Sequence, residues 1–141
     1  MAKLDDIIDK VLNSSYEEKV YAGKESLNRL MNILSEYGYT FDDKKLLIKN
    51  LLRLFVKIDR QFTLEEAQII LDIVEDYMDY ESFVALTNQE ADKKFIKFMK
   101  KVINKFSDEE RVYICTLGLV IITCDNQVDK NEINLLKKLC K

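Results

Sequence analysis

Apolar residues recur along most of this chain at the i, i+3, i+4 and i+7 spacing that predicts amphipathic helices. The first such series is Leu4, Ile7, Ile8, Val11 and Leu12. Short polar segments separate the series. Several of these have the form of a capping box, in which a Ser or Thr and a Glu three residues later bond to each other's backbone N–H groups. The pattern therefore predicts a succession of helices joined by short breaks.

Start and stop signals divide the chain into about seven helices. The predicted starts are Ser14-Ser15 with Glu17-Glu18, Thr40 with Asp43, Thr63 with Glu66, Thr87 with Glu90, Ser107 with Glu110, and Asp129 with Glu132. Gly38 is suited to a helix C-cap, and we expect the helix after it to run to about Ile58. Residues 79–86 are ambiguous. These signals predict one all-α domain over residues 1–141, a helical bundle whose N-terminal helices occupy residues 1–39.

The predicted helix after Ser107 is apolar all round as far as Cys124, with the sequence RVYICTLGLVIITC at its centre. A helix without a polar face belongs in the middle of a bundle. Gly118 lies in its interior and costs about 1 kcal/mol in helix propensity relative to Ala. We expect a neighbouring helix to approach closely at this glycine.

Composition supports the helical class and removes several kinds of chemistry. Proline is absent and glycine occurs three times in 141 residues, so a sandwich or barrel rich in turns is nearly excluded. Histidine is also absent, which removes histidine bases, histidine-containing triads and histidine metal ligands. The formal net charge of −3 lacks the whole-chain basic footprint of a nucleic-acid-binding protein.

The N-terminal segment, the length of the apolar stretches and the cysteine pattern together predict a cytoplasmic protein. The N-terminal segment carries Asp5, Asp6 and Asp9 and has no long apolar run. We therefore do not interpret it as a signal peptide. The longest apolar stretch is shorter than the ~20 residues of a bilayer span. The three cysteines, Cys115, Cys124 and Cys140, form no CxxC pair and lie in apolar helical patterns, which indicates buried reduced thiols.

An internal duplication relates two parts of the chain. An offset of 66 residues, which places Asp125 over Asp59, aligns residues 41–74 with 107–140 without a gap. The identical pairs are Asp42/Asp108, Ile48/Ile114, Leu51/Leu117, Asp59/Asp125, Gln61/Gln127 and Glu66/Glu132. In both copies the chain has the same order of features: an N-cap, an apolar helix, an Asp, a short break, a second N-cap and an amphipathic helix. We interpret residues 40–77 and 107–141 as duplicated helical hairpins.

Each copy contains the motif Asp-x-Gln-φ-x-x-x-Glu, where φ is Phe62 or Val128. The Asp follows an apolar helix directly, where the partial negative charge of the helix C-terminus disfavours a carboxylate. The Glu falls in the first turn of the next helix, where a carboxylate is favoured. The repeated Asp therefore needs compensation, either from the backbone of its own turn or from a cation.

The two motifs, DRQFTLEE at 59–66 and DNQVDKNE at 125–132, resemble the signature of the tellurite-resistance TerB-like family. That family includes the N-terminal domain of membrane-anchored DnaJ-like co-chaperones. Its members are helical bundles with a repeated Asp-Gly-x-[Ile/Val]-x-x-x-Glu signature. Here the glycine is replaced by Arg60 and Asn126. The resemblance covers residues 40–141 and implies a non-enzymatic binding or stress-response module with a divalent-cation site at the repeated acidic residues.

If the hairpins pack symmetrically, both acidic turns reach one end of the bundle. The candidate metal ligands are then Asp59, Glu66, Asp125, Glu132, Gln61 and Gln127. An oxygen-only ligand set suits Ca²⁺, Mg²⁺ or Mn²⁺ and not zinc. The alternative is that each Glu completes its own capping box and each Asp orders its own turn, without metal. Both interpretations remain open from the sequence.

Charged helix faces offer a different function, that of a metal-free protein-interaction adaptor. The basic positions are Lys45, Lys49, Arg53 and Lys57 on one predicted helix, and Lys93, Lys94, Lys97, Lys100, Lys101 and Lys105 on another. The acidic positions are Glu65, Asp72, Glu75, Asp76 and Asp79. The alternative for each stripe is a solvated helix face. We expect a protein partner rather than nucleic acid, and we expect no enzymatic activity. A homo-oligomer is left open.

Overall fold

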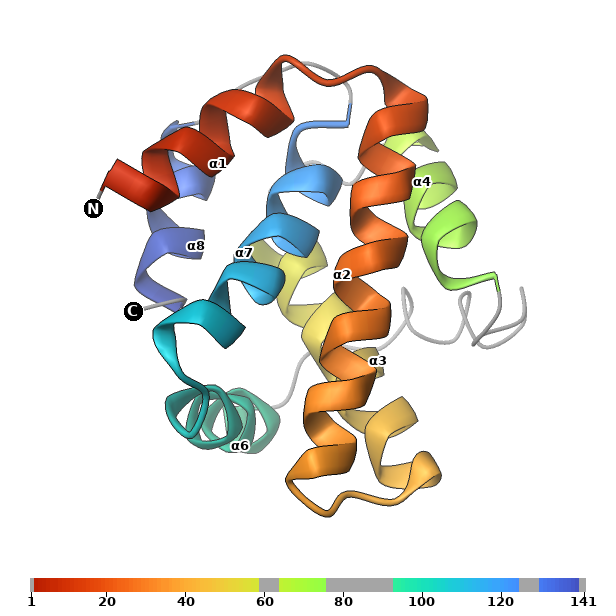
Figure 1. The fold of residues 1–141 in the computed structure, drawn as a ribbon, viewed down its shortest axis with the longest axis vertical. Coiled ribbons are helices and arrows are strands. Elements are labelled where there is room, and N and C mark those ends of the chain that lie inside the picture. Colours follow the sequence, from red (N-terminus) through yellow and green to blue (C-terminus); the bar gives the residue numbers. More distant parts are fainter. Residues whose placement is uncertain (1, 59–63, 76–92, 125–129, 140–141) are drawn as a thin grey trace.

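The computed structural model describes residues 2–58, 64–75, 93–124 and 130–139, and these form seven α-helices. The helices are α1 (Ala2–Leu12), α2 (Tyr16–Glu36), α3 (Phe41–Ile58), α4 (Leu64–Val74), α6 (Lys93–Asn104), α7 (Asp108–Ile122) and α8 (Lys130–Leu139). The prediction of an all-α bundle of about seven helices is confirmed (Figure 1). The predicted starts at Thr63, Thr87 and Asp129 lie outside the described residues.

Capping explains where two of the longer helices begin. Ser15 and Ser107 each accept a hydrogen bond from the backbone N–H three residues on, at Glu18 and Glu110. The two glutamates accept from the serine N–H groups in return, at 2.9 and 2.8 Å. Both predicted boxes are thus confirmed, and each satisfies backbone donors that a helix N-terminus otherwise leaves unpaired.

The turn between α2 and α3 also follows the predicted signals. Tyr37 is the C-cap residue of α2, and Gly38 after it has φ +89°. Glycine adopts this left-handed conformation without the steric cost that a Cβ would add. The Thr40 hydroxyl then accepts from the Asp43 N–H at 3.2 Å, as expected at the start of α3.

Helix α7 is the centre of the bundle, as its apolar sequence predicts. It packs against α1, α2, α3, α4 and α8. Its residues from Leu117 to Ile122 are all buried. Because other helices surround α7, polar side chains on any of its faces would be buried away from water, which is costly. This accounts for the apolar composition of the helix.

Two glycines allow helices to approach closely. A Cβ on Gly118 of α7 would lie 2.7 Å from Leu136 of α8 and 2.8 Å from Phe55 of α3. A Cβ on Gly23 of α2 would lie 2.5 Å from Ile73 of α4. The close approach expected at Gly118 is therefore confirmed, and α2 and α4 meet in the same manner.

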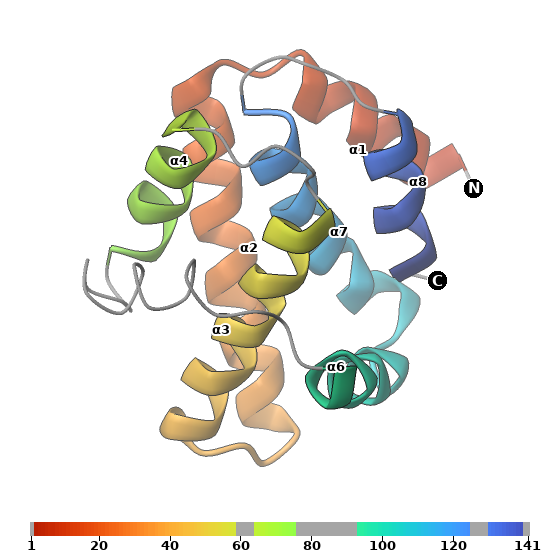
Figure 2. The ribbon, with the colours of Figure 1, turned by 180° about the vertical axis from the view of Figure 1, so that it is seen from behind.

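The chain directions place several helix ends at the same end of the molecule. Helices α2, α4 and α8 begin at the end of the molecule where α7 terminates, and α1 crosses over the same end (Figures 1 and 2). Helix α6 lies toward the opposite end and is seen end-on in both views, so its axis runs across those of α2 and α7 (Figure 2). In the part of the chain described, no helix is long and apolar enough to cross a bilayer.

Candidate functional site

Two of the six predicted metal ligands are described, and both are buried carboxylates. Glu66 is the third residue of α4 and is 2% exposed; Glu132 is the third residue of α8 and is 7% exposed. Both helices begin at the same end of the bundle, and α7 packs against both. Asp59, Gln61, Asp125 and Gln127 lie outside the described residues, so the complete ligand set stays a prediction.

Burial separates these glutamates from the capping-box glutamates of α2 and α7. Glu18 is exposed and Glu110 is half-buried, and each bonds to the backbone N–H of its N-cap serine. That N–H group lowers the pKa of both carboxyls, with further contributions from the Ser15 hydroxyl at Glu18 and the Tyr37 hydroxyl at Glu110. Glu66 and Glu132 hold the same position in their helices but are withdrawn from water. Carboxylates are seldom fully buried unless they are paired.

Sequence reasoning missed the basic residue at this end of the molecule. Lys19 of α2 is 1% exposed, and its Nζ donates a hydrogen bond of 2.6 Å to the Thr123 carbonyl oxygen at the C-cap of α7. A cation is favoured there because unpaired carbonyls give a helix C-terminus partial negative charge. The signal was available, since Lys19 lies one turn before Gly23 on the buried stripe of α2 that continues through Leu27, Leu30 and Leu34.

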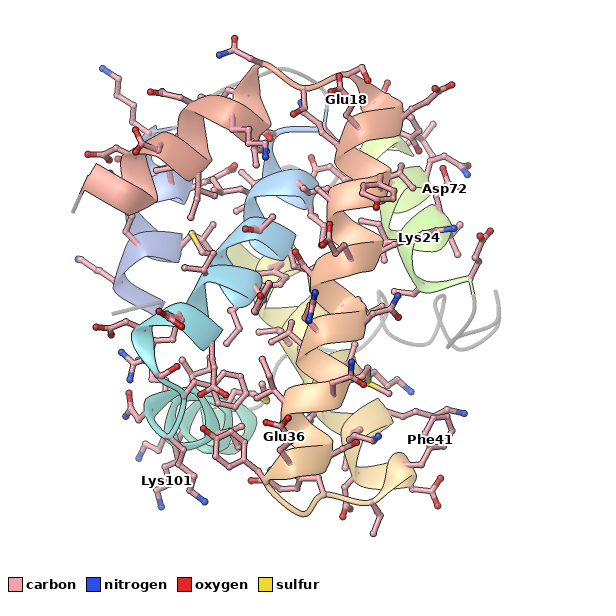
Figure 3. The ribbon with its side chains drawn as sticks, in the orientation of Figure 1. Glu18, Lys24, Glu36, Phe41, Asp72 and Lys101 are labelled. Atoms are coloured by element: carbon pink, nitrogen blue, oxygen red, sulfur yellow. The ribbon has the colours of Figure 1, made fainter. Side chains whose placement is uncertain are left out.

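The seam between α2 and α4 uses acidic residues that the sequence suggested were solvated. The Tyr16 hydroxyl donates to Asp72 Oδ2 at 2.5 Å, and Lys24 pairs with Glu75. In Figure 3, Lys24 of α2 is directed toward α4, and Asp72 of α4 is directed toward α2. Partial burial and the adjacent Asp72 carboxylate raise the pKa of Tyr16 well above its ordinary value. Part of the acidic stripe is therefore neutralised within the chain.

The two basic stripes differ in their surroundings. On α3, Lys44 and Lys45 lie over the ring of Phe41, at 5.8 and 4.7 Å from its centroid, and Lys49 is half-buried. The side chains of Arg53 and Lys57 lie outside the described set. The α6 stripe is exposed at Lys97, Lys100, Lys101 and Lys105. None of these four forms an ion pair with a carboxylate in the described segments.

Helix α6, with the sequence KKFIKFMKKVIN, carries basic residues and no acidic ones. Its inner side carries Met99, Val102 and Ile103, which are buried. Beneath it, apolar side chains from α2, α3, α6 and α7 line a cavity of about 20 Å³, room for about one water. This cavity has no polar wall that could orient a ligand.

The remaining candidate groups for chemistry in the described segments are the carboxylates and two cysteines. No group of three or more Asp, Glu or Cys in them is arranged to hold a metal ion. Cys115 and Cys124 are buried thiols, as predicted, and thiols in apolar surroundings are poor nucleophiles. Cys140 lies outside the described set.

No protein-family model, no curated protein and no solved structure matches this chain.

Proposed function

We propose that this chain is a non-enzymatic, TerB-like binding module that engages an acidic protein segment through the basic face of α6. The observation that carries this proposal is the set of four exposed lysines without carboxylate partners in the described residues, at positions 97, 100, 101 and 105. On α2 and α4, by contrast, Lys24 and Asp72 both have partners within the chain.

Spacing along α6 favours an acidic ligand. Lys97 and Lys101 of α6 are four residues apart, and Lys105 follows directly after the end of the helix. Like charges at this spacing destabilise a helix by about 0.2–0.5 kcal/mol per pair. A partner with carboxylates one turn apart would replace this repulsion with attraction.

The surroundings of α6 favour a short acidic segment over a long polyanion. The first turn of α7, which begins three residues after Lys105, carries Asp108 and Glu109, both exposed. A nucleic acid that extended past the end of α6 would meet this acidic turn and be repelled. A helix-length acidic peptide can stay on the lysine face, which lies at the edge of the molecule near Lys101 (Figure 3).

The test is binding of a fluorescent, Glu-rich helical peptide of about 15 residues, roughly the shortest length at which an isolated helix is stable. The double variant Lys97→Glu/Lys101→Glu should weaken binding by about tenfold or more. Each exposed pair contributes up to about 1 kcal/mol, and reversal turns attraction into repulsion.

The matched control is Lys10→Glu/Lys130→Glu, which changes the net charge equally at two exposed lysines of α1 and α8. Binding should be retained in the control. Equal losses in both variants would show that net charge, and not the α6 face, determines binding, and would refute the proposal.

A second candidate function is divalent-cation binding at the acidic turns. The burial of both Glu66 and Glu132 at one end of the bundle favours it. An ion bound only by the folded state would raise the melting temperature. Ca²⁺, Mg²⁺ or Mn²⁺ should therefore stabilise the protein relative to EDTA, and Glu66→Gln/Glu132→Gln should remove the shift. Absence of any shift in the wild-type protein would eliminate this candidate.

A further inference from the structure

The end of α6 and the start of α7 form one corner of the molecule, to which the end of α2 is also bound. Arg111 of α7 donates hydrogen bonds to the carbonyl oxygens of Ile103 and Asn104, at 3.3 and 3.2 Å. The hydroxyl of Tyr37, at the end of α2, lies 3.1 Å from the Lys105 carbonyl oxygen. These contacts fix the two helix ends to each other and to α2, so the charged side chains at the corner project from backbone that is held in place.

Opposite charges lie next to each other at this corner without pairing. The end of α6 carries Lys101 and Lys105, the first turn of α7 carries Asp108 and Glu109, and all four residues are exposed. Each charge is favoured where it lies, because a helix C-terminus is partially negative and a helix N-terminus partially positive. No ion pair joins the two sets in the segments that the structure describes. The corner therefore has a basic half and an acidic half, and both are open to a partner.

An exposed aromatic residue contacts both halves. Tyr37 is 43% exposed, and its ring stacks on Phe106 with 5.6 Å between the centroids. Its hydroxyl lies 2.8 Å from Glu110 Oε1 on the α7 side, besides its contact with Lys105 on the α6 side. Tyrosine is enriched in protein interfaces, where aromatic area is combined with a polar rim. The corner thus offers an aromatic surface beside charges of both signs.

A second copy of this chain is the partner that fits this pattern. A twofold axis at the corner would place the basic half of each copy against the acidic half of the other, so one contact would satisfy both halves. An unrelated acidic segment that covered the whole corner would pair with the lysines but would be repelled by Asp108 and Glu109. Complementary charge therefore favours self-association over a different acidic partner at this corner.

We infer that this chain forms a salt-sensitive homodimer through the corner between α6 and α7. Lys101 and Lys105 of each copy lie against Asp108 and Glu109 of the other. This inference rests on the proposed function, because it identifies the acidic segment as the first turn of α7 in a second copy. Exposed ion pairs are individually weak and are screened by salt. The dimer therefore belongs to the transient class of interfaces and dissociates as ionic strength rises.

Sedimentation equilibrium of the full chain at low salt, from about 0.02 to 1 mM protein, tests the dimer. The mean mass should rise toward that of two copies and no further, and about 0.5 M sodium chloride should return it to the monomer value. Lys101→Glu/Lys105→Glu and Asp108→Lys/Glu109→Lys should each weaken self-association by about tenfold or more. Each double reversal places like charges against each other in both halves of the contact.

Mixing these two variants, with one of them fluorescently labelled, gives the sharpest test of the pairing. One corner is then uniformly acidic and the other uniformly basic, so the mixture should form a heterodimer although neither variant dimerises alone. The matched control mixes Asp108→Lys/Glu109→Lys with Lys10→Glu/Lys130→Glu, which has the net charge of the acidic variant but the wild-type corner. Half of that contact would be repulsive, so the control should yield no heterodimer. If a double variant fails to fold, Lys101→Glu and Glu109→Lys repeat the experiment.

Asp108→Lys/Glu109→Lys also separates this inference from the proposed function, because it keeps every lysine of α6. It should still bind the Glu-rich peptide although it no longer dimerises. A wild-type protein that binds the peptide but stays monomeric at about 1 mM in low salt would refute the dimer and leave the proposed function intact. Masses that grow past two copies would also overturn the inference, because they indicate a contact that does not close. Absence of the heterodimer in the mixture would refute the pairing of the two halves.

Discussion

Gly118→Ala should destabilise the protein although alanine is the better helix former. Gly118 lies in the middle of α7, the central helix, against Leu136 of α8 and Phe55 of α3. An added Cβ would lie 2.7 and 2.8 Å from carbons of these side chains, and ordinary contact begins at 3.4 Å. Both neighbours are at most 1% exposed, so neither can move into solvent.

The expected magnitude combines two opposing terms. Replacing glycine by alanine in a helix interior gains about 1 kcal/mol. Inserting a methyl group into a packed core costs about 1–3 kcal/mol. Because side chains on two different helices must shift, we take the upper part of that range and expect a net loss of about 1–2 kcal/mol.

Urea denaturation followed by far-ultraviolet circular dichroism measures this loss as a lower midpoint at unchanged slope. Leu136→Ala supplies the matched background, because it removes the nearer of the two neighbours. In that background Gly118→Ala should cost less than it does alone. A Gly118→Ala protein as stable as wild type would refute the close-packing role of this glycine.

Further predictions concern the caps and the turn. Ser15→Ala and Ser107→Ala should each lower the unfolding free energy by about 1 kcal/mol in urea melts, because each removes an N-cap; no loss in either would contradict the capping geometry. The pKa values of Glu18 and Glu110 are lower in the folded state, so their stabilisation is present above the usual value of 4.5 and is lost as pH falls through the folded-state pKa. Glu110→Gln should therefore flatten the acid limb of stability against pH, and an unchanged limb would argue against this linkage. Gly38→Ala should cost about 1 kcal/mol in the same melts because of its positive φ, and a neutral result would contradict the turn conformation.

Local signals in the sequence were sufficient for the starts of α2, α3 and α7 and for the central position of α7. Ser15 with Glu18 and Ser107 with Glu110 form the predicted capping boxes because the interaction spans only three residues. Gly118 also indicated its role, because a glycine inside an apolar helix is costly unless a neighbouring helix packs closely against it. These features depend on neighbours in the chain or on a single helix.

Features that depend on the packing of distant helices could not be predicted with the same ease. Lys19 is flanked by Glu18 and Val20 and resembles a surface lysine, yet it is buried at the end of α7. The helical spacing of α2 places Lys19 on the buried stripe of that helix. Its burial could have been predicted if charged residues had been considered for core positions. Asp72 likewise acquires its partner, Tyr16, only through the docking of α4 on α2. The orientation of α6 across the bundle has no local signal in the chain.

Mapping of the acidic peptide on the isotope-labelled protein by amide chemical shifts tests the proposed binding face most directly. We predict that the shifted resonances cluster in α6, from Lys93 to Asn104, with Lys105 at the edge. They should fade as salt rises above about 0.15 M, where exposed charges are screened beyond about 8 Å. Shifts centred on the first turns of α4 and α8, with α6 unperturbed, would contradict the proposed binding face.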